Sequence, residues 1–308
     1  MKGADASLTP LFILGPTGSG KSAVAVALAE LLGEAEIVSA DAYQVYRGLP
    51  IITAAPTAEE QARVPHHLVG FMHPAENNDA ALHARRAQEC IRAIQARGKR
   101  PVITGGSGLY VKFISHGISP APPSDPALRA ELTALPAAEC VRRLQEADPE
   151  GARMTNLQNP RYVVRNLEIV LLGKKPLSAW KNNWQEAAGP GFVITRETAE
   201  LDARIARRSE QMLREGAAEE LAALNRSLAA EGCSLSATAA KTLGLAQVQA
   251  LLDGRAERAA VVADIALTTR QYAKRQRTWL RREQWVTALQ AGAKDTPARL
   301  AAAIAAQL

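Results

Sequence analysis

Short apolar runs alternate with longer amphipathic segments along the first 120 residues. Apolar runs at 11–14 and 36–41, and a third that enters a glycine turn at 100–110, read as strands. Between them, helices fit 21–32 and 80–97. Strands that alternate with helices predict a parallel sheet with helices on both faces.

The pattern changes at about Ile118. A proline-rich connection leads into helical stretches that reach about Trp184 with few strand signals. Residues 191–198 then read as a returning strand, and 199–228 and 256–282 read as long helices. We therefore predict an α/β core formed by 1–120 and 190–308, interrupted by a helical insertion domain at 121–189.

Composition narrows the class of protein. The chain has 308 residues, 47% of them hydrophobic, and a formal net charge of +6. It contains no run of 18 apolar residues, and its first residues lack the organisation of a signal peptide. We expect a cytoplasmic protein without a membrane partner. The positive charge favours polyanionic partners, although a solvated surface gives the same excess.

The segment LFILGPTGSGKS joins an apolar strand to a helix through a phosphate-binding loop. Its backbone N–H groups and helix N-terminus favour an anion, Lys21 adds a point charge, and the Ser22 hydroxyl can ligate Mg²⁺. The candidate phosphate ligands are Gly15, Pro16, Thr17, Gly18, Ser19, Gly20, Lys21 and Ser22. The alternative is a glycine-rich turn with no ligand.

Asp41 ends the second predicted strand, beside the phosphate-binding loop. Ligands of parallel sheets lie beyond the carboxyl ends of the strands, so this carboxylate can hold Mg²⁺ through water or accept a proton. A helix N-cap or turn aspartate is the alternative. His66 and His67 face opposite sides of an extended chain and lack further zinc-like spacing, so we expect a packing role for them.

Basic residues gather in two later segments. Arg204 and Arg208 lie one turn apart on a predicted helix, and their forked guanidinium groups suit a diphosphate. The run RQYAKRQRTWLRR at 270–282 has six basic residues, no acidic residue and two interleaved aromatic side chains. It fits either a nucleic-acid surface or a solvated helical face.

Seven motifs, in order, resemble those of the tRNA dimethylallyltransferases, also called tRNA isopentenyltransferases. They are GPTGSGKS, SADAYQVYRGLPIITAAPT, PHHL, GGSGLY, NPRYVVRNLEI, RIARRSEQMLREG and TRQYAKRQRTW, and they span about 11–285. The family's usual DIGTAKP reads PIITAAP here, so Pro50, Ile52 and Ala55 replace Asp, Gly and Lys.

The resemblance implies transfer of a five-carbon prenyl group from dimethylallyl diphosphate to N6 of the adenosine directly 3′ of the anticodon. It implies a P-loop NTPase-like sheet, Asp41 as general base, and Lys21, Arg204 and Mg²⁺ at Ser22 as stabilisers of the leaving diphosphate. Arg208 joins the diphosphate site, and Ser107 keeps the hydroxyl of the family's GGTGLY motif.

The implied RNA partner is the tRNA anticodon stem-loop, bound by a monomer. The residues matched to this role are Asp41, Ala42, Tyr43, Gln44, Ser107, Arg129, Arg161, Arg165, Arg270, Lys274 and Arg275. Three alternatives stay open: a P-loop kinase or NTPase, an adenylate isopentenyltransferase acting on free nucleotides, and an RNA-binding protein without chemistry.

Overall fold

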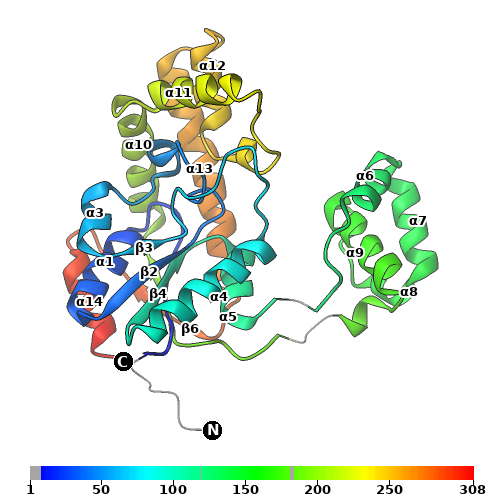
Figure 1. Cartoon of the computed structure of the whole chain (residues 1–308), viewed down its shortest axis with the longest axis horizontal. Coiled ribbons are helices and arrows are strands. Elements are labelled where there is room, and N and C mark those ends of the chain that lie inside the picture. Colours follow the sequence, from blue (N-terminus) through cyan, green and yellow to red (C-terminus); the bar gives the residue numbers. More distant parts are fainter. Residues whose placement is uncertain (1–7, 119, 181–183) are drawn as a thin grey trace. The chain divides into compact units, whose positions relative to one another are not determined.

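The computed structural model describes residues 8–118, 120–180 and 184–308. It divides the chain into two compact units: Met1–His116 with Glu186–Leu308, and Gly117–Gln185 (Figure 1). The second unit begins and ends four residues earlier than the insertion predicted at 121–189.

A six-stranded sheet organises the first unit. All its strands are parallel, in the order β3-β2-β4-β1-β5-β6. Their bounds are β1 Leu11–Leu14, β2 Ala35–Ala40, β3 His66–His67, β4 Arg100–Gly105, β5 Gly191–Thr195 and β6 Val286–Gln290. The parallel sheet confirms the predicted α/β fold, and the two edge strands β3 and β6 are additions to the prediction.

Helices cover both faces of this sheet. Side chains alternate along β1, so Leu11 and Ile13 pack with α1 (Lys21–Leu32) and α14 (Pro297–Ala305). Phe12 and Leu14 point to the opposite face and pack with α4 (Ala80–Ala96) and α5 (Gly108–His116). Because both faces are buried, the central strands carry no polar stripe for solvent.

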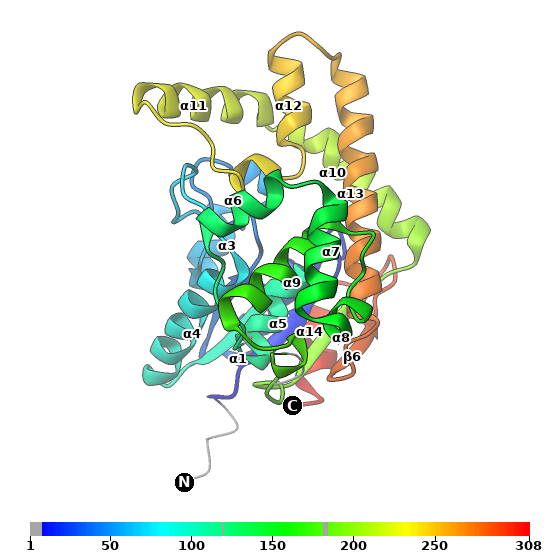
Figure 2. The ribbon, with the colours of Figure 1, turned by 90° about the vertical axis from the view of Figure 1, so that its right-hand side faces the viewer.

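A helical group rises from one end of the sheet (Figure 2). It contains α10 (Thr198–Arg214), α11 (Ala217–Ala230), the 3₁₀ turn η3 (Ala239–Lys241), α12 (Leu245–Leu252) and α13 (Arg258–Leu280). The short α2 (Pro50–Thr53) contacts α11, whereas α3 (Ala58–Arg63) contacts α1. The single helix predicted at 199–228 was wrong. Gly216 adopts a φ of 103°, which separates α10 from α11, because this left-handed region is accessible to glycine.

The second unit has a core of its own. Its elements are α6 (Pro126–Ala134), α7 (Ala137–Ala147), α8 (Pro149–Arg153), α9 (Pro160–Gly173) and the 3₁₀ turn η2 (Leu177–Ala179). Leu132, Leu144 and Leu167 are buried at its centre. Proline begins α6, α8 and α9, where its missing N–H leaves no hydrogen bond unmade. Among the described residues, no helix is both long and apolar enough to cross a membrane.

Candidate active site

The phosphate-binding loop connects β1 to α1 at the carboxyl edge of the sheet. Gly18 and Gly20 adopt φ angles of 82° and 90°, so the loop follows a path that other residues rarely take. Arg204 Nε donates to the Gly18 carbonyl oxygen over 2.8 Å, and Arg196 Nε donates to the Ser19 carbonyl oxygen over 2.8 Å. The Thr17 N–H donates to Gln276 Oε1 over 2.8 Å. Three distant side chains therefore hold the loop in shape.

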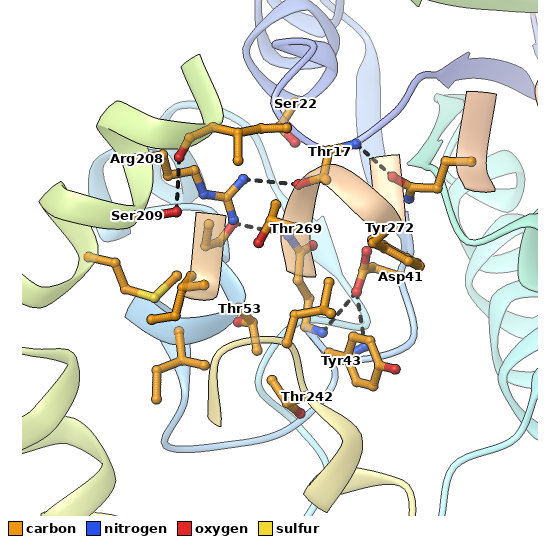
Figure 3. Close-up of a pocket in the computed structure, with 18 of the residues that line it drawn as sticks. Thr17, Ser22, Asp41, Tyr43, Thr53, Arg208, Ser209, Thr242, Thr269 and Tyr272 are labelled. Atoms are coloured by element: carbon orange, nitrogen blue, oxygen red, sulfur yellow. Dashed lines mark hydrogen bonds between the residues drawn. The ribbon is translucent and has the colours of Figure 1, made fainter. Parts of the chain in front are cut away.

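A pocket opens beside this loop (Figure 3). The phosphate-binding loop and α1 contribute Thr17, Lys21 and Ser22, and the end of β2 contributes Asp41. One wall of the pocket is apolar and consists of Ile52, Ile205, Met212, Leu243 and Ile265. The remaining lining residues are Tyr43, Gln44, Thr53, Ala54, Arg208, Ser209, Thr242, Thr269, Tyr272 and Gln276. The cationic end of the pocket thus faces the same space as a carboxylate and an apolar wall.

Two cations at this end have no acidic partner. No carboxylate among the described residues lies within 4 Å of Lys21 Nζ or of the Arg208 guanidinium. Burial lowers the pKa of Lys21 to about 8, an effect that Asp41 opposes and Arg208 reinforces. Burial also lowers the pKa of Arg208, against the raising effect of Asp41. Both charges are therefore held in an environment that favours an incoming anion.

Asp41 shapes its own turn and faces the pocket. Its Oδ1 accepts the Tyr43 N–H over 2.9 Å and the Gln44 N–H over 3.4 Å, as a turn aspartate does. Oδ2 accepts no hydrogen bond from the described residues, so one carboxylate oxygen is available to a substrate. The turn and proton-acceptor interpretations of Asp41 are thus compatible.

The glycine turn after β4 packs against α13. Ser107 Oγ lies 3.1 Å from the Tyr272 hydroxyl, and a Cβ at Gly106 would approach Gln276 Nε2 to 2.6 Å. Ser107 itself is buried and reaches the pocket through Tyr272, which lines it. Burial, together with the charge of Asp41, raises the pKa of Tyr272, so this hydroxyl stays protonated.

The basic run divides between different faces of α13. Ile265, Thr269, Tyr272 and Gln276 recur at helical spacing and line the pocket. Arg270, Lys274, Arg277 and Arg281 recur with the same spacing on another face and line a groove against α10. Arg275 stands apart from both sets, with its guanidinium carbon 5.6 Å from the centre of the Tyr272 ring.

In the insertion unit, two of the three predicted RNA-binding arginines have an acidic partner. Arg129 and Arg165 both donate to Oε2 of Glu168, which is fully buried. Arg161 is exposed at the first turn of α9 and makes no ion pair with a described residue. Contacts of all three with RNA stay a prediction.

The donor set of the pocket fits Mg²⁺ better than zinc. Mg²⁺ takes few protein oxygens and fills its octahedral shell with water and phosphate, and the Ser22 hydroxyl and Asp41 carboxylate line one pocket. The described residues hold no group of three or more His, Cys, Asp or Glu side chains that suits a metal ion. His67 Nε2 instead lies 2.7 Å from Glu36 Oε2, and His66 Nδ1 lies 2.7 Å from the Val64 carbonyl oxygen.

Three contributors to the site were missed by sequence reasoning. Arg196 follows β5 directly, so the rule that sites lie beyond the carboxyl ends of strands could have found it. Tyr272 was noted only as an aromatic residue in a basic run. Gln276 lies within the quoted motif TRQYAKRQRTW, but its contact with the Thr17 N–H could not be read from that motif, because it depends on α13 packing against the phosphate-binding loop.

Comparisons with known proteins agree on one family. A family model described as IPP transferase matches residues 44–283. The tRNA dimethylallyltransferase of Akkermansia muciniphila is 54% identical over 299 residues, which cover 97% of this chain and 99% of that protein. The enzyme of the same name from Halorhodospira halophila is 42% identical over 283 residues, with coverages of 88% and 89%.

Solved structures show the same architecture. The tRNA isopentenylpyrophosphate transferase of Bacillus halodurans matches with a TM-score of 0.67 and 30% identity, over 97% of this chain and 96% of that one. A eukaryotic dimethylallyltransferase acting on tRNA matches with a TM-score of 0.79 and 23% identity, over 92% and 74%. At that identity the second likeness concerns the fold alone.

Proposed function

The chain belongs to the IPP transferase family, and on that premise we propose that it prenylates tRNA. The reaction moves a dimethylallyl group from dimethylallyl diphosphate to N6 of the adenosine directly 3′ of the anticodon. The observation that carries this proposal is the pocket in which unpaired cations, one carboxylate and an apolar wall meet.

The cationic end of the pocket suits the diphosphate of the donor. Loop N–H groups at the start of α1, Lys21 and Arg208 offer positive charge that no described carboxylate neutralises. Arg204 supports this site through the Gly18 carbonyl oxygen. The apolar wall, which includes Met212 and Leu243, suits the five-carbon chain.

Asp41 suits the acceptor amine. As N6 bonds to C1 of the dimethylallyl group, the C–O bond to the diphosphate breaks and its electron pair leaves with the diphosphate. Oδ2 of Asp41 then takes the proton that N6 loses. Lys21 and Arg208 stabilise the charge that gathers on the leaving group.

Mg²⁺ is part of this proposal. Ser22 Oγ would hold the ion, which would supply further positive charge to the diphosphate when bound, while Asp41 stays the proton acceptor.

The adenosine must leave the stacked anticodon loop to reach the pocket, because a stacked base cannot present N6 to the donor carbon. Gln44 at the pocket wall is the residue we assign to the base edge. Arg275 beside Tyr272 would hold the nearby RNA backbone, with Arg270 and Lys274 on their own face of α13 and Arg161 on the insertion. A monomer in the cytoplasm, where tRNA is available, completes the proposal.

Labelled substrates test the proposal. Protein incubated with unmodified tRNA should transfer label from dimethylallyl diphosphate to RNA, and mass spectrometry of the nucleosides should find adenosine heavier by one C₅H₈ unit. Consumption of labelled ATP, with the prenyl donor untouched, would instead identify a P-loop kinase or NTPase. Transfer to free AMP but not to tRNA would identify an adenylate isopentenyltransferase.

A further inference from the structure

The short helix α2 lies at the wall of the pocket and is anchored by a residue far away in sequence. Glu220, in the first turn of α11, accepts two hydrogen bonds from it. Oε2 accepts the Ile51 N–H over 2.7 Å, and Oε1 accepts the Ile52 N–H over 3.0 Å. Both carboxylate oxygens are therefore committed to the backbone of α2.

This anchor compensates for a missing local cap. The first N–H groups of a helix have no partner within the helix, and the residue before α2, Leu49, offers no side-chain acceptor. Pro50 has no N–H, so Ile51 and Ile52 carry the first two donors that need a partner. Burial raises the pKa of Glu220, while the hydrogen bonds from Ile52 and Ile51 oppose that shift.

The far end of α2 holds the side-chain amide of Gln44. Ala54, which ends α2 with a φ of 45°, accepts the Gln44 Nε2 N–H at its carbonyl oxygen over 3.0 Å. Ser39 Oγ donates to Gln44 Oε1 over 3.0 Å. Each end of the amide thus has one partner among the described residues, which leave the second N–H of Nε2 and the second lone pair of Oε1 available.

We infer that Glu220 is a positioning residue for recognition of the acceptor base. By holding the start of α2 it fixes the Ala54 carbonyl oxygen, and that oxygen determines which way the Gln44 amide presents its free donor and acceptor. A base edge with one donor and one acceptor, as in adenine, is the ligand that such an amide recognises. The inference rests on the proposed function, in which Gln44 reads the base.

A double-mutant cycle tests this connection. Glu220→Ala and Gln44→Ala should each lower kcat/KM for tRNA about tenfold, the size expected for one or two neutral hydrogen bonds, while KM for dimethylallyl diphosphate stays unchanged. The double variant should be no worse than Gln44→Ala alone, because Glu220 acts through Gln44. Glu219→Ala, one residue away on the exposed side of the same turn, should behave like wild type.

The inference would be overturned if the losses in kcat/KM of the two single variants multiplied in the double variant. It would also be overturned if Gln44→Ala left kcat/KM for tRNA unchanged. Circular dichroism and the unfolding temperature confirm that each variant is folded; if Glu220→Ala is not, Glu220→Gln, which keeps one acceptor oxygen, replaces it in the cycle. A wild-type protein that leaves tRNA unmodified overturns the proposed function itself. If the wild-type protein prenylates tRNA but the losses in kcat/KM of the two single variants multiply in the double variant, only the role of Glu220 is overturned.

Discussion

Two cations of the pocket and two arginines of the insertion unit lie in opposite electrostatic settings. In the pocket, Lys21 and Arg208 face an open space, and no described carboxylate pairs with them. In the insertion unit, Arg129 and Arg165 converge on Glu168, whose carboxylate also accepts the Ser124 hydroxyl over 2.8 Å.

The pKa shifts express the same difference. Burial lowers the pKa of Lys21 and of Arg208, so each positive charge is energetically costly in the absence of an anion. Burial alone would raise the pKa of Glu168, but hydrogen bonds from Arg129, Arg165 and Ser124, together with the charge of Arg129, outweigh it and lower that pKa. The ion pairs of Arg129 and Arg165 therefore help to stabilise the insertion unit. In our proposal, Lys21 and Arg208, which have no carboxylate partner among the described residues, meet the substrate anion.

Removing the only carboxylate among the described lining residues of the pocket should have the largest effect. Asp41→Asn keeps the turn acceptor Oδ1 but cannot take the proton of N6. We expect kcat to fall by about 10²- to 10⁴-fold, the usual contribution of a positioned general base, with an unchanged unfolding temperature. Single-turnover kinetics with prenyl donor and tRNA measure this. An unchanged kcat would remove Asp41 from catalysis.

In the insertion unit, the matching change should affect stability instead. Glu168→Gln leaves Arg129 and Arg165 without a counter-charge, and we expect the free energy of unfolding at pH 7 to fall by about 3 kcal/mol. This is the lower end for a broken buried pair, because both arginines are about one-third exposed. Urea unfolding followed by hydrogen exchange in α9 measures the change.

Glu146→Gln is the control, since this exposed residue pairs with Arg142 on the surface and should cost less than about 1 kcal/mol. The lowered pKa of Glu168 also determines how its contribution to the free energy of unfolding depends on pH. Its contribution is complete above the unfolded pKa of about 4.3 and is lost as the pH falls below that value, through the lower folded pKa. Equal effects of the two substitutions would erase the distinction between the paired and unpaired cations.

The groove face of α13 should produce a smaller effect. If Arg270 and Lys274 each neutralise one RNA phosphate, replacing both with alanine flattens the plot of log K against log salt by about 1.5 units and weakens different tRNAs similarly. Filter binding at several salt concentrations measures the slope. Arg142→Ala, which removes an arginine with acidic partners, should leave the slope unchanged; the same slope in both variants would make the groove a solvated surface.

The sequence predicted those elements that carry a strong local signal. Continuous apolar runs marked β1, β2, β4 and β5, and a glycine-rich turn marked the phosphate-binding loop. The edge strand β3 has only two residues, and β6 is partly exposed, so neither forms a buried run. Gly216 carried the break between α10 and α11, but a single glycine within an amphipathic pattern does not by itself end a helix.

The site was partly predictable for a similar reason. Lys21, Ser22 and Asp41 belong to local motifs and do line one pocket. The support from Gln276 and Glu220 depends on helices that are distant in sequence packing against the phosphate-binding loop and α2. Such contacts arise from tertiary packing, so no local sequence pattern predicts them.

The most direct test of the role of the unpaired cations is a calorimetric titration of Arg208→Met with dimethylallyl diphosphate. Loss of a charge-assisted hydrogen bond to the diphosphate should raise the dissociation constant by about 10- to 150-fold. The unfolding temperature should stay the same or rise, because the removed charge is half-buried and has no acidic partner among the described residues, only a hydrogen bond of 3.3 Å to the Thr17 hydroxyl. An unchanged dissociation constant, or an unfolding temperature several degrees lower, would contradict the account.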